Sequence, residues 1–181
     1  METIGGRCHI HNAAAIFFYR HDSAYCEIVR QFKYGGDKAL GLWAAHLLGD
    51  YLAAGGLYDG VQAVVPVPLH WRKRWKRGFN QAEIIARGVA QRLGNLPVTP
   101  GLLRRRRYTA TQTRKGAEQR AGNVSGAFAL NRREAERLRS AGVRHILLVD
   151  DVVTTGATIS ECVRLLEPCF TVSVATLGFV E

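Results

Sequence analysis

The chain has 181 residues, of which 47% are hydrophobic and 22% charged, a composition typical of one folded domain and not of a disordered or repetitive chain. No stretch of roughly eighteen consecutive apolar residues occurs, so we expect no membrane insertion and a cytoplasmic location. The net charge of +10 is concentrated in residues 71–120, which contain fourteen Lys or Arg but only Glu83 and Glu118. This field predicts an anionic partner such as a polyphosphate, a nucleic acid or a membrane surface.

The first half of the chain reads as strands alternating with helices. The expected elements are a strand over 13–19, helices over 23–32 and 38–54, a strand over 62–65 and a helix over 80–93. In the helix over 38–54, the apolar spacing predicts an inward stripe made of Leu40, Trp43, Ala44, Leu47, Leu48 and Tyr51. The strand over 62–65 should end at Pro66, because proline lacks the N–H that a sheet needs. A basic loop is expected between that strand and the next helix.

The second half begins with hairpin arms and ends with alternating strands and helices. The expected elements are arms over 97–103 and 127–130, helices over 118–124, 132–140 and 157–166, and strands over 145–149 and 171–177. The unbroken Ile-Leu-Leu-Val run at 146–149 indicates a strand that is buried on both faces. Strands that alternate with helices predict a doubly wound, mostly parallel α/β sheet, which binds ligands at the carboxyl ends of its strands.

The segment ILLVDDVVTTGAT (146–158) has the composition of a phosphate site. It places Asp150 and Asp151 at the end of the buried strand, and residues 153–158 form the turn into the next helix. Backbone N–H groups at a helix start, small residues and threonine hydroxyls suit a dianionic phosphate. Two carboxylates would repel that phosphate unless they also bind hydroxyl groups or a metal ion, and a sugar phosphate meets both conditions. The chain has no G-x-x-x-x-G-K-[ST] motif, so a P-loop nucleotide site is not predicted.

The same segment resembles the phosphoribosyl pyrophosphate (PRPP) signature of the type I phosphoribosyltransferases. Further stretches resemble the ComF family of competence proteins, in the order found there. They are FKYGGD (32–37), PVPL (66–69), RGFNQAE (77–83), residues 112–120 with Asn123-Val124, and Ala127-Phe128. The resemblance covers nearly the whole chain and implies a single domain over 1–181 with the type I phosphoribosyltransferase fold. Within it we expect residues 1–37 and the tail after Leu177 to form a small hood that selects the acceptor, and 104–120 to form a flexible basic loop.

The resemblance also implies roles for individual residues. Asp150 and Asp151 would bind the ribose hydroxyls and Mg²⁺ and would act in catalysis with Arg120, while residues 154–158 would hold the 5′-phosphate. Arg77-Gly78-Phe79 would bind pyrophosphate under a lid formed by the basic loop. The full set of expected substrate-binding residues is Arg77, Gly78, Phe79, Lys115, Asp150, Asp151, Val153, Thr154, Thr155, Gly156, Ala157 and Thr158. No zinc is expected, because the cysteine-rich segment that family members often carry is reduced here to Cys8.

Two interpretations of function follow. In the first, the protein is an enzyme that transfers phosphoribose from PRPP to a nitrogenous acceptor and releases pyrophosphate. In the second, it handles single-stranded nucleic acid during DNA uptake and uses the PRPP fold for binding or sensing without turnover. Residues 70–77 (HWRKRWKR) and 104–107 (RRRR) would then contact the strand, with Trp71 and Trp75 stacking on bases. The two tryptophans could instead pack against the sheet, and neither the acceptor nor the choice between monomer and homodimer can be read from the sequence.

Overall fold

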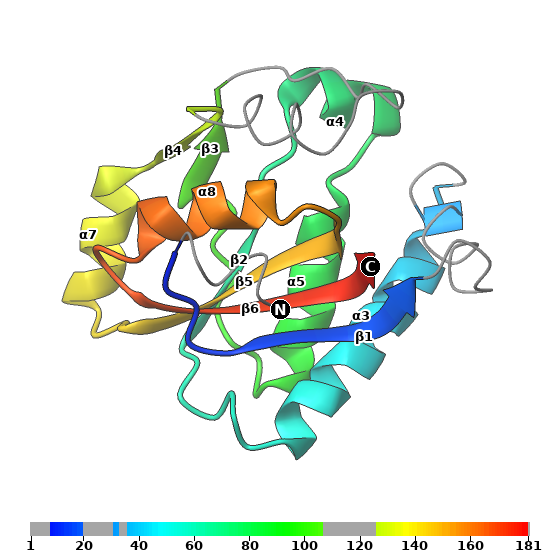
Figure 1. The fold of residues 1–181 in the computed structure, drawn as a ribbon, viewed down its shortest axis with the longest axis horizontal. Coiled ribbons are helices and arrows are strands. Elements are labelled where there is room, and N and C mark those ends of the chain that lie inside the picture. The colour runs from blue at the N-terminus through cyan, green and yellow to red at the C-terminus, as the bar shows by residue number, and fades with distance from the viewer. Residues whose placement is uncertain (1–7, 20–30, 33–35, 107–125, 181) are drawn as a thin grey trace.

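The computed structural model describes residues 8–19, 31–32, 36–106 and 126–180. Four parallel strands form the main sheet in the order β1, β6, β5, β2, and a separate antiparallel pair joins β3 to β4 (Figure 1). The strands are β1 (Ala13–Tyr19), β2 (Ala63–Pro66), β3 (Leu103–Arg105), β4 (Phe128–Leu130), β5 (His145–Val153) and β6 (Thr171–Val180). The strands β5 and β6 therefore lie in the middle of the main sheet.

Helices cover both faces of this sheet. They are α3 (Lys38–Ala54), α4 (Trp71–Arg77), α5 (Gln81–Arg92), α7 (Arg132–Ser140) and α8 (Ala157–Leu166). Side chains of α3 and α5 share one apolar core with Leu147 and Val149 of β5. Side chains of α7, α8 and the β3–β4 pair share a second core with Ile146 and Leu148, on the opposite face. This arrangement confirms the predicted doubly wound, parallel α/β architecture.

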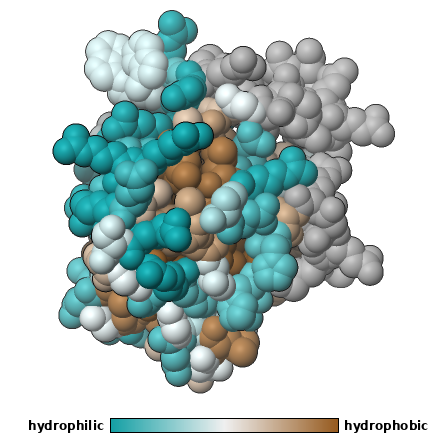
Figure 2. Space-filling view, turned by 90° about the vertical axis from the view of Figure 1, so that its left-hand side faces the viewer, coloured by the Kyte–Doolittle hydropathy of each residue, from teal (hydrophilic) through white to brown (hydrophobic). Residues whose placement is uncertain are grey.

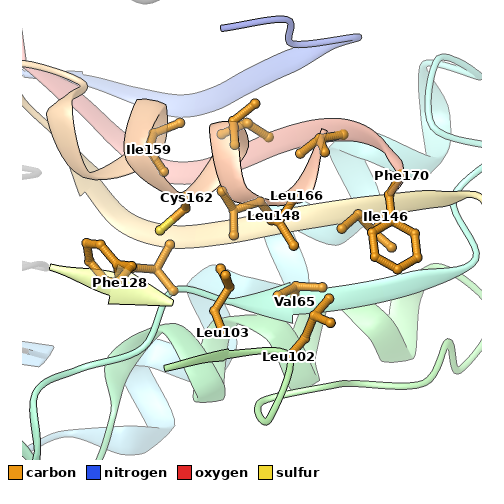
Figure 3. Close-up of a cluster of buried hydrophobic side chains, with 14 of the residues drawn as sticks. Val65, Leu102, Leu103, Phe128, Ile146, Leu148, Ile159, Cys162, Leu166 and Phe170 are labelled. Carbon is orange, nitrogen blue, oxygen red and sulfur yellow. The ribbon is translucent and has the colours of Figure 1, made fainter. Parts of the chain in front are cut away.

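The strand β5 is buried on both faces because its side chains alternate between the two cores. Figure 3 shows Ile146 and Leu148 in the second core together with Ile159, Cys162 and Leu166 of α8. Each of these side chains is at most 1% exposed, and burying an aliphatic side chain of this size stabilises a fold by about 1.5–3 kcal/mol. A slip of one residue would exchange the two faces, so this burial also fixes the register of the strand.

The helix α3 buries only part of the predicted stripe: Ala44 and Leu48 are fully buried, and Leu40 is half-buried. The helix packs against α5, and its buried residues combine four small residues with two leucines: Gly41, Ala44, Ala45, Leu48, Gly49 and Leu52. A Cβ atom at Gly88 of α5 would lie 2.6 Å from the Cβ of Ala45, so the close approach of the helices requires glycine there. Trp43, Leu47 and Tyr51 are 53%, 42% and 60% exposed, and their predicted inward orientation is wrong.

The boundaries near the carboxyl ends of β5 and β2 also differ from the predicted ones. The strand β5 continues through Val153, and β2 includes Pro66 as its last residue, which is tolerated because β2 is an edge strand of the main sheet. Residues 71–77, predicted as a loop, form the helix α4. Of the arm predicted over 97–103, Val98 makes a single bridge to β2, and β3 begins only at Leu103.

Some predicted segments cannot be compared. The helix expected over 118–124 lies outside the described residues, as does most of the helix expected over 23–32. Within residues 1–37, the segment expected to form a hood, β1 is a strand of the main sheet. None of the described helices combines the length and the apolar character that crossing a bilayer requires.

The helix α7 confirms the polar helix predicted over 132–140. Ala135 and Leu138 face the second core, while its arginines are exposed. Figure 2 views the molecule from the side on which α7 lies, and hydrophilic side chains surround a smaller apolar area there. The helix α7 therefore covers part of the second core and turns its polar residues toward solvent.

Candidate functional site

The carboxyl ends of β5 and β2 lie side by side at one edge of the sheet. Their parallel pairing aligns Pro66 with Val149, and the N–H of Val67 donates to the carbonyl of Val149 at 2.9 Å. The chain that leaves β5 enters α8, and the chain that leaves β2 enters α4. Both turns therefore start from the edge at which doubly wound sheets bind ligands.

Asp150 and Asp151 lie at this edge as the sixth and seventh residues of β5. Both are half-buried. Asp150 Oδ1 accepts the N–H of Asp151 at 2.9 Å, and Asp151 Oδ1 accepts the N–H of Val152 at 2.6 Å. Since each carboxylate is bonded to the backbone of the next residue, the two acids are oriented before any ligand binds.

The charge of Asp150 affects the thiol of Cys162 in α8. Burial raises the pKa of the Cys162 thiol well above its ordinary value, and the negative charge of Asp150 raises it further. The thiol is therefore protonated at neutral pH and is not suited to act as a nucleophile or a metal ligand. The acid pair, and not the neighbouring cysteine, is therefore the candidate for chemistry at this edge.

The turn between β5 and α8 has the form of an anion cradle. Gly156 precedes the helix with a φ of 69°, in the left-handed region that favours glycine. Within the described part of the chain, no side chain caps this helix start, and the N–H of Ser160 donates to the carbonyl of Gly156 at 2.8 Å. The N–H groups of the first turn, beginning at Ala157, have no intrahelical partner and carry the positive end of the helix dipole. A phosphate suits such a position.

The remaining predicted phosphate residues surround this turn. Thr154 is exposed, and Thr155 and Thr158 are half-buried. Val153 differs from them, because its side chain is 5% exposed and belongs to the core shared with α8. A contact between Val153 and a ligand would therefore involve its backbone alone.

A second turn at the same edge ends at Gly78. The helix α4 begins where Nδ1 of His70 accepts the N–H of Arg72 at 3.3 Å. Gly78 ends this helix with a φ of 79°, and its N–H donates to the carbonyl of Arg74 at 2.7 Å. The predicted pyrophosphate segment is thus a left-handed turn between two helices.

Asn80 fastens this turn to the sheet. Its Oδ1 accepts the N–H of the second residue of α5 at 3.3 Å, and its Nδ2 donates to the carbonyl of Val67 at 3.1 Å. The side chain of Phe79 packs inward, with its ring centroid 5.9 Å from that of Phe32 and 5.3 Å from Nζ of Lys38. Phe79 therefore anchors the turn, and a ligand would meet its backbone.

Three predicted site residues cannot be placed at the level of their side chains. Lys115 and Arg120 lie outside the described residues. Arg77 is the last residue of α4, but its side chain, like those of Lys73 and Lys76, is not among those described. Their roles stay predictions.

The tryptophans of α4 point outward. Trp71 is 64% exposed and Trp75 is 89% exposed, so the alternative in which both pack against the sheet is wrong. The guanidinium carbon of Arg72 lies 5.1 Å from the centroid of the Trp71 ring. Trp71, Arg74, Trp75 and Gly78 line an open hollow of about 520 Å³. This helix therefore presents aromatic and cationic side chains together, beside the Gly78 turn.

Sequence reasoning missed the part played by two side chains. The predicted helix over 80–93 begins at Asn80, but its pattern does not reveal that Asn80 is the cap, although asparagine is common there. The run RRRR predicts four cations at 104–107 that contact a nucleic-acid strand, but Arg105 is half-buried in β3, with its guanidinium carbon 5.1 Å from the ring centroid of Phe128. The period of two in a strand puts Arg105 on the same face as Leu103, and the predicted strand ended too early to reveal this.

Comparison with known proteins agrees with this geometry. The family model described as "Phosphoribosyl transferase domain" matches residues 76–177. The chain is 35% identical to Competence protein F of Haemophilus influenzae over 105 residues. The aligned part covers 58% of this chain and 44% of that protein. The chain is 34% identical over 142 residues to DNA utilization protein YhgH of Salmonella typhimurium, covering 77% of this chain and 59% of that protein. It thus spans about half the length of these two relatives.

A third relative aligns over more of its length. Competence protein ComFC of Streptococcus pneumoniae is 31% identical over 170 residues, which cover 92% of this chain and 67% of that protein. The family model covers more than half of the chain and includes both turns of the ligand edge from Gly78 to Thr158. The chain therefore belongs to the ComF family of competence proteins, within the phosphoribosyltransferase superfamily.

Proposed function

We propose that this protein binds PRPP with Mg²⁺ and transfers its phosphoribosyl group to a nitrogenous acceptor, with release of pyrophosphate. The observation that supports this most strongly is the succession of paired carboxylates and an uncapped helix start in one short segment, from Asp150 to Thr158. Carboxylates bind the hydroxyls of a pentose, and the helix start binds the phosphate on its 5′-carbon. A phosphate alone would be repelled by the acids, and a neutral sugar would leave the cradle unused.

The reaction needs opposite charges at the two ends of the breaking bond. When the bond between C1 and the pyrophosphate oxygen breaks, the electron pair leaves with pyrophosphate and the ribose becomes oxocarbenium-like. The acceptor nitrogen then forms the new bond to C1 and loses a proton to water. Asp150 and Asp151 beneath the ribose would stabilise its positive charge, and Arg77, Lys115 and Arg120 are the cations expected near the leaving group.

The residues present fit Mg²⁺. Asp150 and Asp151 offer hard oxygen ligands, and Mg²⁺ commonly binds one or two carboxylates together with substrate phosphates. Bound there, Mg²⁺ would neutralise charge that develops on the pyrophosphate. Backbone N–H groups hold the two half-buried carboxylates in place, so the protein ligands of such a site are oriented in advance.

Calorimetric titration with Mg-PRPP and with ribose 5-phosphate tests the binding step. Asp150→Asn keeps the size of the side chain and an oxygen that accepts the N–H of Asp151. It should weaken both ligands by about thirtyfold, which corresponds to the loss of about 2 kcal/mol from charge-assisted hydrogen bonds. Asp59→Asn, at an exposed position after α3, should change neither. Unchanged affinity in Asp150→Asn would contradict the assignment.

Release of pyrophosphate tests the transfer step. The protein is incubated with Mg-PRPP and each member of a panel of purines, pyrimidines and simple amines, and pyrophosphate is measured. Release that depends on one acceptor identifies the substrate. Tight PRPP binding without release from any acceptor would favour a protein that senses PRPP without turnover.

Single-stranded nucleic acid is a second candidate ligand, and the exposed helix α4 favours it. Trp71 and Trp75 are accessible to bases, and Arg72 and Arg74 lie beside them on the same helix. The relatives named for competence and for DNA utilization are consistent with this proposal. On this view the aromatic rings stack on bases while the cations neutralise the backbone.

A gel-shift series with single-stranded DNA at increasing salt tests the second candidate. Binding should weaken steeply with salt, and the exposed positions of the rings mean that replacing Trp71 and Trp75 by alanine should abolish the shift without unfolding the protein. The pair Asp150→Asn/Asp151→Asn serves as the control, since a shift that persists in it shows a surface separate from the PRPP site. A shift that does not respond to loss of the tryptophans would refute stacking on α4.

A further inference from the structure

One arginine of the β3–β4 pair faces inward. Of the three consecutive arginines that the structure describes here, Arg104 and Arg106 are exposed and Arg105 is half-buried. Side chains alternate along a strand, so Arg105 shares a face with Leu103, which is 1% exposed in the core beneath α8. Arg105 therefore differs from its exposed sequence neighbours, Arg104 and Arg106.

The same reasoning places Asp150 on the matching face of β5. Ile146 and Leu148 lie in the core beneath α8, and Asp150 follows Leu148 by two residues in the same strand. Figure 3 shows Leu103 and Leu148 in one cluster of buried side chains. Arg105 and Asp150 are thus the polar residues that continue this core on β3 and on β5.

The guanidinium of Arg105 interacts with an aromatic ring and with the charge of an acid. It lies opposite Phe128 in the β3–β4 register, with its guanidinium carbon 5.1 Å from the ring centroid. Burial lowers the pKa of Arg105, whereas the negative charge of Asp150 acts in the opposite direction and stabilises the cation. Since arginine keeps its charge in proteins, a fixed positive charge faces the acid.

The β3–β4 pair is also fixed relative to α8. Phe128 is 4% exposed and packs in the cluster that contains Cys162 of α8 (Figure 3). The N–H of Gly126 donates to Glu161 of α8 at 2.7 Å, and the N–H of Arg106 donates to the carbonyl of Ala127 at 2.8 Å. The base of the pair is therefore attached to the helix whose start follows the acid pair.

We propose that Arg105 is a positioning residue for Asp150, holding its carboxylate in the orientation that accepts a ribose hydroxyl. This role rests on the proposed binding of PRPP and explains how two acids can lie next to a phosphate. The planar guanidinium provides charge and direction at once, and Asp150 is the acid whose negative charge acts on it. Arg105 acts through Asp150 and needs no contact with the ligand.

Calorimetric titration of a small set of variants tests this role. Arg105→Met removes the charge and keeps most of the length, Arg105→Lys keeps the charge, and Arg133→Met on the exposed side of α7 is the control. Arg105→Met should weaken Mg-PRPP and ribose 5-phosphate by a similar factor of about ten, because both depend on Asp150. Arg105→Lys should recover part of the loss, and Arg133→Met should bind like the wild type. Thermal unfolding checks that each variant is folded, and Arg105→Gln replaces the Met variant if that one is not.

A double-mutant cycle separates a positioning role from an independent one. If Arg105 acts through Asp150, then Arg105→Met combined with Asp150→Asn should bind no more weakly than Asp150→Asn alone. Losses that multiply would overturn the proposal, as would a folded Arg105→Met variant that binds both ligands like the wild type. A loss confined to PRPP would mean direct contact with pyrophosphate and would also overturn it. Wild-type protein that binds neither ligand would refute the proposed function itself, and the role of Arg105 with it.

Discussion

Replacing Gly156 by alanine should weaken ligand binding and leave the protein folded. Gly156 has a φ of 69° at the start of α8, where the backbone would meet the phosphate. A residue with a Cβ in the left-handed region costs roughly 1–2 kcal/mol. For a chain of this size a loss of about 1 kcal/mol lowers the thermal midpoint by about 2–4 °C. The variant should therefore fold, and its binding can be measured.

Gly142 provides a matched control for this strain. It has a φ of 86°, no atom lies within 4 Å of an added Cβ, and it precedes the amino end of β5, opposite the ligand edge. Gly142→Ala should lose a similar amount of stability in urea unfolding. It should bind ribose 5-phosphate like the wild type. Gly156→Ala should weaken that ligand by about tenfold, because a backbone shift that relieves the strain and breaks one N–H contact to a charged phosphate costs about 1.5 kcal/mol.

The comparison of the two variants has a clear failing result. Equal affinities for ribose 5-phosphate in Gly156→Ala and Gly142→Ala, measured by calorimetry on folded protein, would refute the phosphate site at the start of α8. The turn would then be a connection between a strand and a helix and no more.

Three further predictions concern the leaving group, the core and the pH dependence of stability. Arg77→Ala should weaken Mg-PRPP by about tenfold and leave ribose 5-phosphate nearly unchanged in titration, because its expected contact is with pyrophosphate alone; equal losses would misplace it. Leu148→Ala should lower the free energy of unfolding in urea by about 2–5 kcal/mol, since this fully buried side chain would leave a cavity, and a loss below 1 kcal/mol would contradict the described core. Burial lowers the pKa of His145 below its ordinary 6.5, and the neighbouring His11 lowers it further. Protonation of His145 therefore favours the unfolded chain, so the free energy of unfolding should fall as the pH falls through 6.5. His145→Gln should flatten this dependence in urea unfolding between pH 8 and pH 5, and an unchanged slope would assign it to other groups.

The region around β5 and α8 could be predicted because its signals are local. An uninterrupted aliphatic run at 146–149 fits a strand with both faces covered, and a glycine before a helix marks the turn. The extension of β5 through Val153 was not predicted, because two acids end an apolar run without ending the hydrogen bonding to β6. That pairing continues to Phe179 and depends on a strand that comes later in the chain.

The packing face of α3 could be predicted only in part, because the helix is apolar nearly all round. Its seventeen residues include only Lys38 and Asp50 as charged groups, so no polar face marks the side that meets solvent. The buried side is instead chosen by fit, since Gly49 and Gly88 let α3 and α5 approach closely. The fit between α3 and α5 depends on both helices, so the sequence of one helix does not predict it.

The position of Arg105 depends on the partner of its strand. In RRRR every residue has the same chemistry, and only the β3–β4 register, which sets Arg105 opposite Phe128, distinguishes one from the next. The two residues are separated by a long segment of the chain. A pairing between distant segments therefore decided which cation faces the acid pair.

The most direct test of the central claim is a crystal structure of the protein with Mg-PRPP bound. We predict the 5′-phosphate on the N–H groups at the start of α8 and the ribose hydroxyls on Asp150 and Asp151. PRPP bound elsewhere, or an occupied cradle with both carboxylates turned away from the sugar, would contradict the account.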